Sequence, residues 1–310
     1  MKKIKEAILN FKNKTKESPF SLFRIFLGIV IILDTFQRMS LSSLLYSDQG
    51  ILPRSIVITN SYDFSLFFIS GSPYFSFLLF SINIIMGLLI IFRVHTLKAI
   101  LISLFIVISY QNRAPTVFYG GDQVLKILIF FSIFFPFNKK NNLLKDGNFY
   151  FFVYLIQVSF IYWGSLFFKL SSSDQWFPKG VALKQLIQFE SIIYPLFHNL
   201  KINDILSQAL SFSVLLMLFV TPILFFCGWK LRRVAAYLLI MFHSTIFLTL
   251  KVGLFPIINI VSLLPLLKNH KINPFQNFSF EKKSILKNSA LCFSLFFIFI
   301  WNFKTFFLKN

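Results

Sequence analysis

The residue with the clearest chemical potential in this sequence is Lys169, a lone charge near the end of a long apolar stretch. Residues 148–170 contain no other charged side chain, and a short polar turn and Trp176 follow. As a helix, this stretch would span roughly 34 Å at a rise of ~1.5 Å per residue, about a hydrocarbon core plus an interface. Two interpretations of Lys169 stay open: a charge that reaches water along its aliphatic stem, or a base at a membrane face.

Other ionisable residues interrupt apolar segments and need partners, because a charge inside a membrane span costs about 2.5–3.5 kcal/mol on insertion scales. Asp34 and Arg38 are four residues apart, so we expect them to pair on one helix face. Asp122 follows two glycines and can cap a helix N-terminus, or pair with Lys126 one turn later. Arg24 lies near a helix end, where we expect its charge to reach water.

A polar cavity open to the outer side of the membrane would bring the candidate residues together. His243 lies near the middle of an apolar segment, where an interhelical hydrogen bond and a functional role are both open. The residues that we expect to line the cavity, with Lys169 as a base, are Asp34, Arg38, Asp122, Lys126, Trp176 and His243.

The composition predicts the elements that hold these residues. Hydrophobic residues make up 56% of the 310 positions and the mean hydropathy is +0.72, which is too apolar for a soluble chain of this length. We therefore predict an all-α, polytopic transmembrane helical bundle. Apolar windows indicate nine helices, over residues 20–38, 73–92, 97–110, 121–137, 148–170, 205–229, 234–251, 252–267 and 288–304. The conformation of residues 41–72 stays open.

The distribution of Lys and Arg predicts the orientation of these helices. With the N-terminus inside, inner segments hold about twice as many Lys and Arg as outer ones, which places the C-terminus outside. Residues 1–19 form a basic cytoplasmic segment, and residues 1–310 a single membrane domain. Attraction of the inner segments to anionic lipid explains the net charge of +20 without a nucleic-acid partner. The separated Cys227 and Cys292 predict no metal site.

Several stretches, in order, resemble one membrane-protein family. They read LFRIFLGIVIILDTFQRMSLSSLLYSDQGILPRS, FYGGDQVLKILIFFSIFFPF, YWGSLFFKLSSSDQWFPKGVAL and RRVAAYLLIMFHSTIFLTLKVGLFPIINIVSLLPLL. These stretches resemble the HTTM domain, the membrane module shared with vitamin K-dependent gamma-carboxylases. The chain is also similar to sporulation-delaying toxin maturation proteins, which are small multi-pass members of this superfamily.

The resemblance implies a role for Lys169, which matches a lysine regarded in the carboxylases as the base that deprotonates reduced vitamin K. Partial desolvation at an interface favours a neutral amine, which a lipid quinone can reach laterally. Two departures argue against glutamate carboxylation by this chain alone: no large extracytoplasmic domain follows the membrane module, and APTVFYGGD lacks a histidine found in those enzymes. A peptide substrate or a soluble partner protein would then come from elsewhere.

The function expected is thus a quinone- or lipid-dependent modification or maturation factor in the cell membrane, with a bacterial inner membrane favoured by the AT-rich codon usage that the composition indicates. Whether the chain is an enzyme stays open. The first alternative is a non-catalytic membrane scaffold or partner subunit, in which Lys169 is an interface anchor. The second is a transporter, for which the sequence lacks repeated pore-lining faces.

Overall fold

The computed structural model describes residues 20–60, 64–135, 147–172 and 174–267. The predicted cytoplasmic segment 1–19 and the predicted ninth helix, 288–304, lie outside the described residues. Eight longer helices and several short ones make up the described chain, and no strand is assigned within it. The longer helices are α2 (Ser21–Met39), α5 (Pro73–Phe92), α6 (Thr96–Arg113), α7 (Gly120–Ser132), α8 (Gly147–Ser172), α10 (Asp204–Leu224), α11 (Trp229–Thr249) and α12 (Phe255–Leu263).

The predicted helix boundaries agree with the structure for α5 but not for the turn between α10 and α11. The second predicted helix coincides with α5, which begins at Pro73. The boundary predicted after residue 229 was wrong, because α10 ends at Leu224 and α11 already begins at Trp229. Gly228 separates the two helices with a φ of 96°, a left-handed conformation that only glycine adopts without strain.

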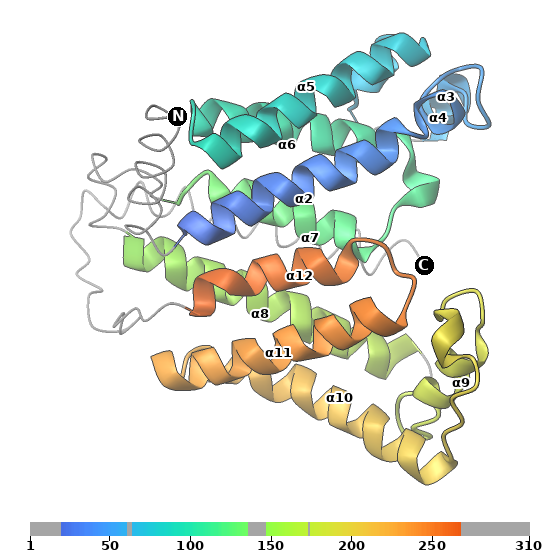
Figure 1. Cartoon of the computed structure of the whole chain (residues 1–310), viewed down its shortest axis with the longest axis vertical. Coiled ribbons are helices and arrows are strands. Elements are labelled where there is room, and N and C mark those ends of the chain that lie inside the picture. Colours follow the sequence, from blue (N-terminus) through green and yellow to red (C-terminus); the bar gives the residue numbers. More distant parts are fainter. Residues whose placement is uncertain (1–19, 61–63, 136–146, 173, 268–310) are drawn as a thin grey trace, which may run out of the picture. The chain divides into compact units, whose positions relative to one another are not determined.

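Successive long helices run in opposite directions, as contacts at their ends show (Figure 1). At one end, Arg24 of α2 donates to backbone carbonyls at the C-terminus of α5, and Arg233 of α11 donates to the carbonyl of Leu267 after α12. Phe20, just before α2, stacks on Phe135 after α7 with centroids 4.1 Å apart. We call this end of the helices the Arg24 end, and the opposite end, where α2 and α6 finish and α7 begins, the Asp122 end.

Arg24 does not reach water as the sequence suggested. Its side chain is buried, and its guanidinium binds the carbonyls of Ile90 and Ile91. The last carbonyls of a helix have no partner within that helix, so a neighbouring arginine can satisfy them and also complement the negative end of the helix dipole. Arg24 thus ties α2 to α5.

Helices α2 and α5 approach closely because each presents a glycine to the other. A Cβ placed on Gly28 would lie 2.8 Å from the carbonyl oxygen of Gly87, and one on Gly87 would lie 3.1 Å from that of Gly28. Small residues at such a crossing are typical of helix pairs in membranes. Asn83 of α5 reinforces the pair by donating to the hydroxyl of Thr35 in α2 over 2.7 Å.

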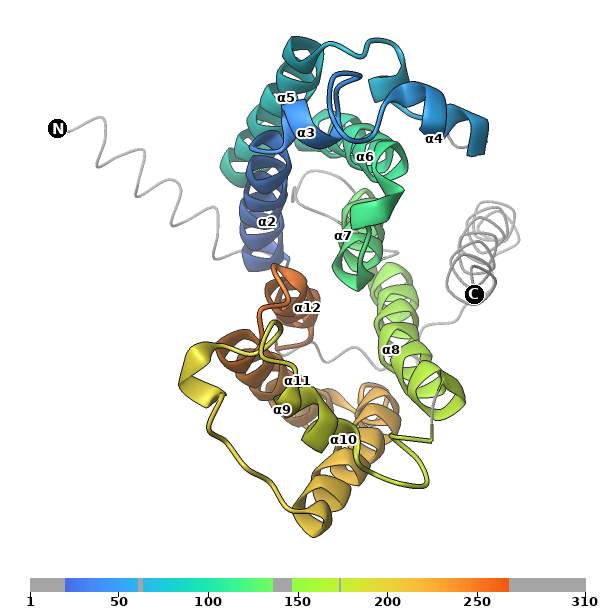
Figure 2. The same ribbon diagram turned by 90° about the vertical axis from the view of Figure 1, so that its right-hand side faces the viewer.

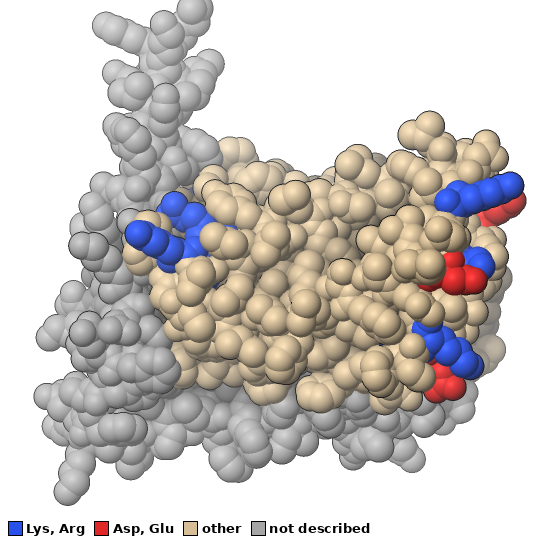
Figure 3. Space-filling view, turned by 90° about the horizontal axis from the view of Figure 1, so that it is seen from below, with Lys and Arg blue, Asp and Glu red and all other residues tan. Residues whose placement is uncertain are grey.

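In the part of the chain that the structure describes, four helices are long and apolar enough to cross a membrane: α5, the Phe151–Ser171 part of α8, α10 and α11. Their outward faces carry large apolar side chains, such as Leu216 at 63% exposed and Met241 at 67%. On the face formed by α10 and α11, charged side chains gather at two opposite ends with an uncharged surface between them (Figure 3). An apolar surface of this extent indicates a membrane protein.

Short helices cross the Asp122 end, where the sequence left residues 41–72 open (Figure 2). They are α3 (Ser42–Leu45), α4 (Arg54–Asn60), the 3-10 turn Leu66–Phe68 and, on the other side, α9 (Ala182–Gln188). Asp48 organises the first loop by accepting hydrogen bonds from the backbone N–H and the guanidinium of Arg54. Slight burial raises the pKa of the Asp48 carboxyl, but the hydrogen bonds and the charge of Arg54 lower it by more, so the net shift is downward.

Candidate functional site

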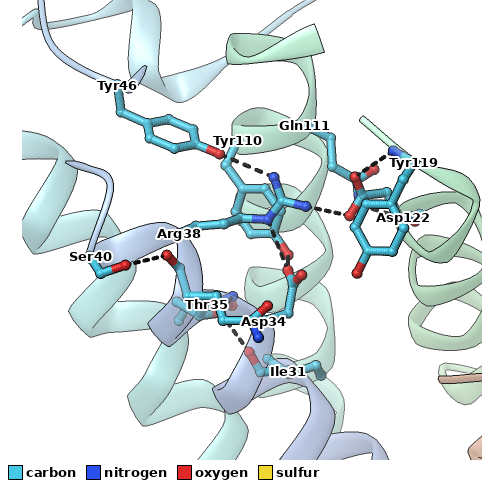
Figure 4. Close-up of polar contacts among 12 residues, drawn as sticks. Ile31, Asp34, Thr35, Arg38, Ser40, Tyr46, Tyr110, Gln111, Tyr119 and Asp122 are labelled. Carbon is cyan, nitrogen blue, oxygen red and sulfur yellow. Dashed lines mark hydrogen bonds and ion pairs between the residues drawn. The ribbon is translucent and has the colours of Figure 1, made fainter. Parts of the chain in front are cut away.

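A buried arginine, Arg38, is the centre of a polar cluster at the Asp122 end (Figure 4). Its Nε donates to Oδ2 of Asp34 over 3.1 Å, which confirms the predicted i, i+4 pair. A terminal nitrogen of the same guanidinium pairs with Oδ1 of Asp122, and the other donates to the hydroxyl of Tyr46 over 3.1 Å. One arginine therefore links the end of α2, the start of α7 and the loop after α3.

Asp122 combines this ion pair with a cap on α7. Its Oδ2 accepts from the backbone N–H of Tyr119 over 3.2 Å, which confirms the predicted role at this helix N-terminus. Gln111 of α6 donates to the backbone carbonyl of Asp122 over 3.0 Å and holds the same turn from the other side. Lys126, the other partner expected for Asp122, lies with its Nζ 5.9 Å from the centroid of the Phe118 ring.

Tyrosines complete the cluster, although they were not among the residues predicted from the sequence. The hydroxyl of Tyr110 donates to Oδ2 of Asp34 over 2.5 Å, and the guanidinium carbon of Arg38 lies 4.5 Å from the centre of the Tyr110 ring. Burial raises the pKa of the Tyr46 hydroxyl, which therefore stays neutral beside Arg38. The sequence did hold a signal for them: Tyr110 and Gln111 lie near the end of α6, and Asp122 lies at the start of α7, so the short connection brings their polar groups to one end of the helices.

Lys169 lies in a second group, in the last turn of α8, which is also at the Asp122 end of the helices. Its Nζ donates to the hydroxyl of Ser165 over 2.9 Å and lies 5.1 Å from the centroid of the Trp176 ring. The predicted neighbours Lys169 and Trp176 are thus in contact. The side chain of Lys169 is half-buried, and no described carboxylate forms an ion pair with it. The ammonium group therefore has a neutral hydroxyl and an aromatic face as its neighbours.

His243 belongs to a third group, buried between helices. Its Nε2 lies 3.3 Å from the hydroxyl of Tyr162 on α8, and the ring of Phe255 lies at a centroid distance of 5.9 Å. Nδ1 has no hydrogen-bond partner among the described residues. Tyr162, Ser165 and Lys169 follow one face of α8 at helical spacing, so the second and third groups share a stripe of this helix.

The contacts therefore divide six of the seven predicted residues into three groups, and Lys126 lies near Phe118. Asp34, Arg38 and Asp122 form one, Lys169 and Trp176 another, and His243 with Tyr162 the third. Within the described ranges, no set of His, Cys, Asp and Glu side chains is arranged to hold a metal ion. The three groups offer carboxylates, a guanidinium, an amine, an imidazole and hydroxyls.

Comparison with known proteins gives no relative from which a role could be transferred: no family model, no curated protein and no solved structure matches this chain.

Proposed function

We propose that this is an integral membrane protein of the HTTM type that acts on a lipid-soluble quinone or similar lipid, with the amine of Lys169 as the base. The observation that carries the proposal is the setting of Lys169: half-buried at the end of a helix apolar enough to span a membrane, beside Ser165 and Trp176. No described carboxylate holds its charge in place. Of the three groups, this one best suits proton transfer to an amine.

The residues around Lys169 suit an aromatic, lipid-soluble ligand. Trp176 offers a ring face beside the amine, and Phe167, Phe168 and Phe177 are exposed nearby in sequence at the same end of α8. When bound, a reduced quinone supplies an acidic hydroxyl and redox chemistry. The protein's own part is to take up that proton on Nζ of Lys169, while the hydroxyl of Ser165 orients the amine.

The Asp122-end cluster has a supporting role in this proposal. Its carboxylates already bind Arg38, Tyr110 and the α7 backbone, so they are committed to holding α2, α6 and α7 together. A modification or maturation function would further require a peptide or soluble partner protein at the outer face. An interface anchor is the competing role for Lys169, and contact with Trp176 fits that role as well.

Quinone content tests the proposal. The full-length protein is purified in mild detergent, and lipid extracts are analysed by mass spectrometry for wild type, Lys169→Ala, Lys169→Arg and the control Lys179→Ala. Lys179 pairs with Asp174 on the exposed surface, so its replacement removes a charge at the same end without touching Lys169. We expect near-stoichiometric quinone in wild type and in Lys179→Ala, and a loss of about tenfold in Lys169→Ala.

Lys169→Arg separates the base from the anchor. A guanidinium stays charged, so it can replace an interfacial anchor but cannot accept a proton. With quinone redox turnover as the readout, we expect Lys169→Arg to accumulate at the wild-type level and to be inactive. Wild-type protein without quinone above the membrane background, or an active Lys169→Arg, would contradict the proposal.

A further inference from the structure

Arg232, in the first turns of α11, is a buried cation with which no carboxylate of the described ranges forms an ion pair. Its side chain is 1% exposed, and its Nε donates to the carbonyl of Phe225 over 2.8 Å. The guanidinium carbon lies 5.2 Å from the centroid of the Phe151 ring. Both terminal nitrogens, with four N–H donors between them, have no hydrogen-bond partner among the described residues. A buried charge left in this state costs several kcal/mol.

The start of α11 adds further donors next to this guanidinium. Helix side chains lean toward the N-terminus, and the bond to Phe225 places the Arg232 guanidinium beside the turn from which α11 begins. The N-cap is Gly228, and no side chain caps the first turn. The free N–H groups of a 21-residue helix carry a partial positive charge that favours an anion.

The residues around this turn resemble a site at a membrane interface. Trp229 is half-buried, with the guanidinium carbon of Arg233 at 4.9 Å from its ring and Nζ of Lys230 at 5.8 Å. Lys230 is exposed in the same turn. Tryptophan, lysine and arginine together are enriched where helices meet the headgroup region.

No described carboxylate is available to neutralise Arg232. The basic residues of the Arg24 end are Arg24, Arg93, Lys98, Lys230, Arg232 and Arg233, whereas every acidic residue in the described ranges belongs to helix ends or loops of the Asp122 end. Figure 3 shows the same asymmetry on one face: one end carries only basic side chains, and the other carries both signs. Within the described ranges the negative charge has no protein source, which is the reason to look for an anionic ligand.

The geometry points to a phosphate-binding site formed by the terminal nitrogens of Arg232 and the N-terminus of α11. A guanidinium presents its donors as a planar fork that matches two phosphate oxygens, and helix N–H groups can bind a third. The ligand is a phosphate group, carried either by the headgroup of an anionic phospholipid or by free phosphate. This site is at the opposite end of the helices from Lys169, so it stands apart from the proposed function.

Lipid titration of the full-length protein tests this site. Phosphatidylglycerol is added to the protein in a nonionic detergent, and both the rise in Tm and the lipid adducts seen by native mass spectrometry are measured. The variants are Arg232→Gln and the control Lys230→Gln, which removes the same charge from the same turn at an exposed position. We expect Arg232→Gln to raise the half-saturating lipid concentration about tenfold, and Lys230→Gln to raise it about twofold.

Two further arms identify the phosphate source and guard against a misfolded variant. Inorganic phosphate, compared with chloride at equal ionic strength, will raise the Tm only if the site accepts free phosphate; a response to phosphatidylglycerol alone assigns the lipid headgroup. Arg232→Lys keeps the charge but loses the fork, so we expect intermediate lipid binding. Equal losses in Arg232→Gln and Lys230→Gln, or no response of the wild-type protein to either probe, would overturn the site.

Discussion

Arg38 and Arg232 are both buried guanidinium groups, at 7% and 1% exposure, yet their surroundings are opposite. Arg38, at the Asp122 end, binds two carboxylates and a tyrosine hydroxyl, and stacks on a second tyrosine. Arg232, at the Arg24 end, binds one backbone carbonyl and lies over a phenylalanine ring. Carboxylates of the fold neutralise the first cation, whereas no carboxylate among the described residues pairs with the second.

Burial alone therefore does not reveal what an arginine does. Removing a charge from water is unfavourable in both places, and only partners with good geometry offset the cost. Arg38 has those partners on α2 and α7, so its role is to join helices. Arg232 keeps four N–H donors unused among the described residues, which is the reason to expect a ligand there.

Replacing Arg38 should have the largest effect on stability. Arg38→Met leaves the carboxylates of Asp34 and Asp122 buried without their cation, which we expect to cost about 3–5 kcal/mol of stability. Thermal or denaturant unfolding of the purified protein in detergent, followed by circular dichroism, measures the loss.

A double mutant isolates the charge pairing in that loss. Asp122→Asn removes one of the two carboxylates that Arg38→Met leaves without a cation. The double mutant should therefore be more stable, by about 1–3 kcal/mol, than the sum of the two single losses predicts. Strictly additive effects would mean that Arg38 stabilises the fold by packing and not by charge.

Arg232→Met should have a much smaller effect when no phosphate or anionic lipid is present. The change loses one hydrogen bond to the Phe225 carbonyl but also removes an unmatched buried charge, so we expect a net change below about 1.5 kcal/mol. The Tm values of wild type, Arg232→Met and Arg38→Met, measured together in phosphate-free nonionic detergent, test this expectation. A loss as large as that of Arg38→Met would show that Arg232 already has an internal partner.

The exposed ion pair of Asp48 and Arg54 should give the smallest effect. Their side chains are 38% and 29% exposed, so water screens the pair, and we expect Asp48→Asn to cost less than about 1 kcal/mol at neutral pH. The pKa of Asp48 is lowered in the folded protein, so its contribution is present above the unfolded pKa and is lost as the pH falls through the folded value.

Tm measurements of wild type and Asp48→Asn at pH 7 and near pH 3 follow this loss. The difference between the two proteins should shrink at the lower pH. A difference that stays constant would assign the effect to hydrogen bonds of the loop and not to ionisation.

Local sequence patterns were sufficient to predict the helical class, the bounds of α5 and two polar contacts. Asp34 with Arg38, and Asp122 with the start of α7, are separated by three or four residues, so helical geometry alone brings each pair together. Apolar runs of about 20 residues likewise predict membrane-length helices, because length and hydropathy depend only on the residues present.

The joining of those local pairs was decided by tertiary structure. Arg38 and Asp122 are 84 residues apart, and their ion pair exists only because α2, α6 and α7 bring their ends together. The same packing buried Arg24 and Arg232. Arg24 caps the C-terminus of α5, whereas both terminal nitrogens of Arg232 have no hydrogen-bond partner among the described residues. Residue types specify which groups need a partner, and the partners that each one meets depend on contacts between segments far apart in the chain.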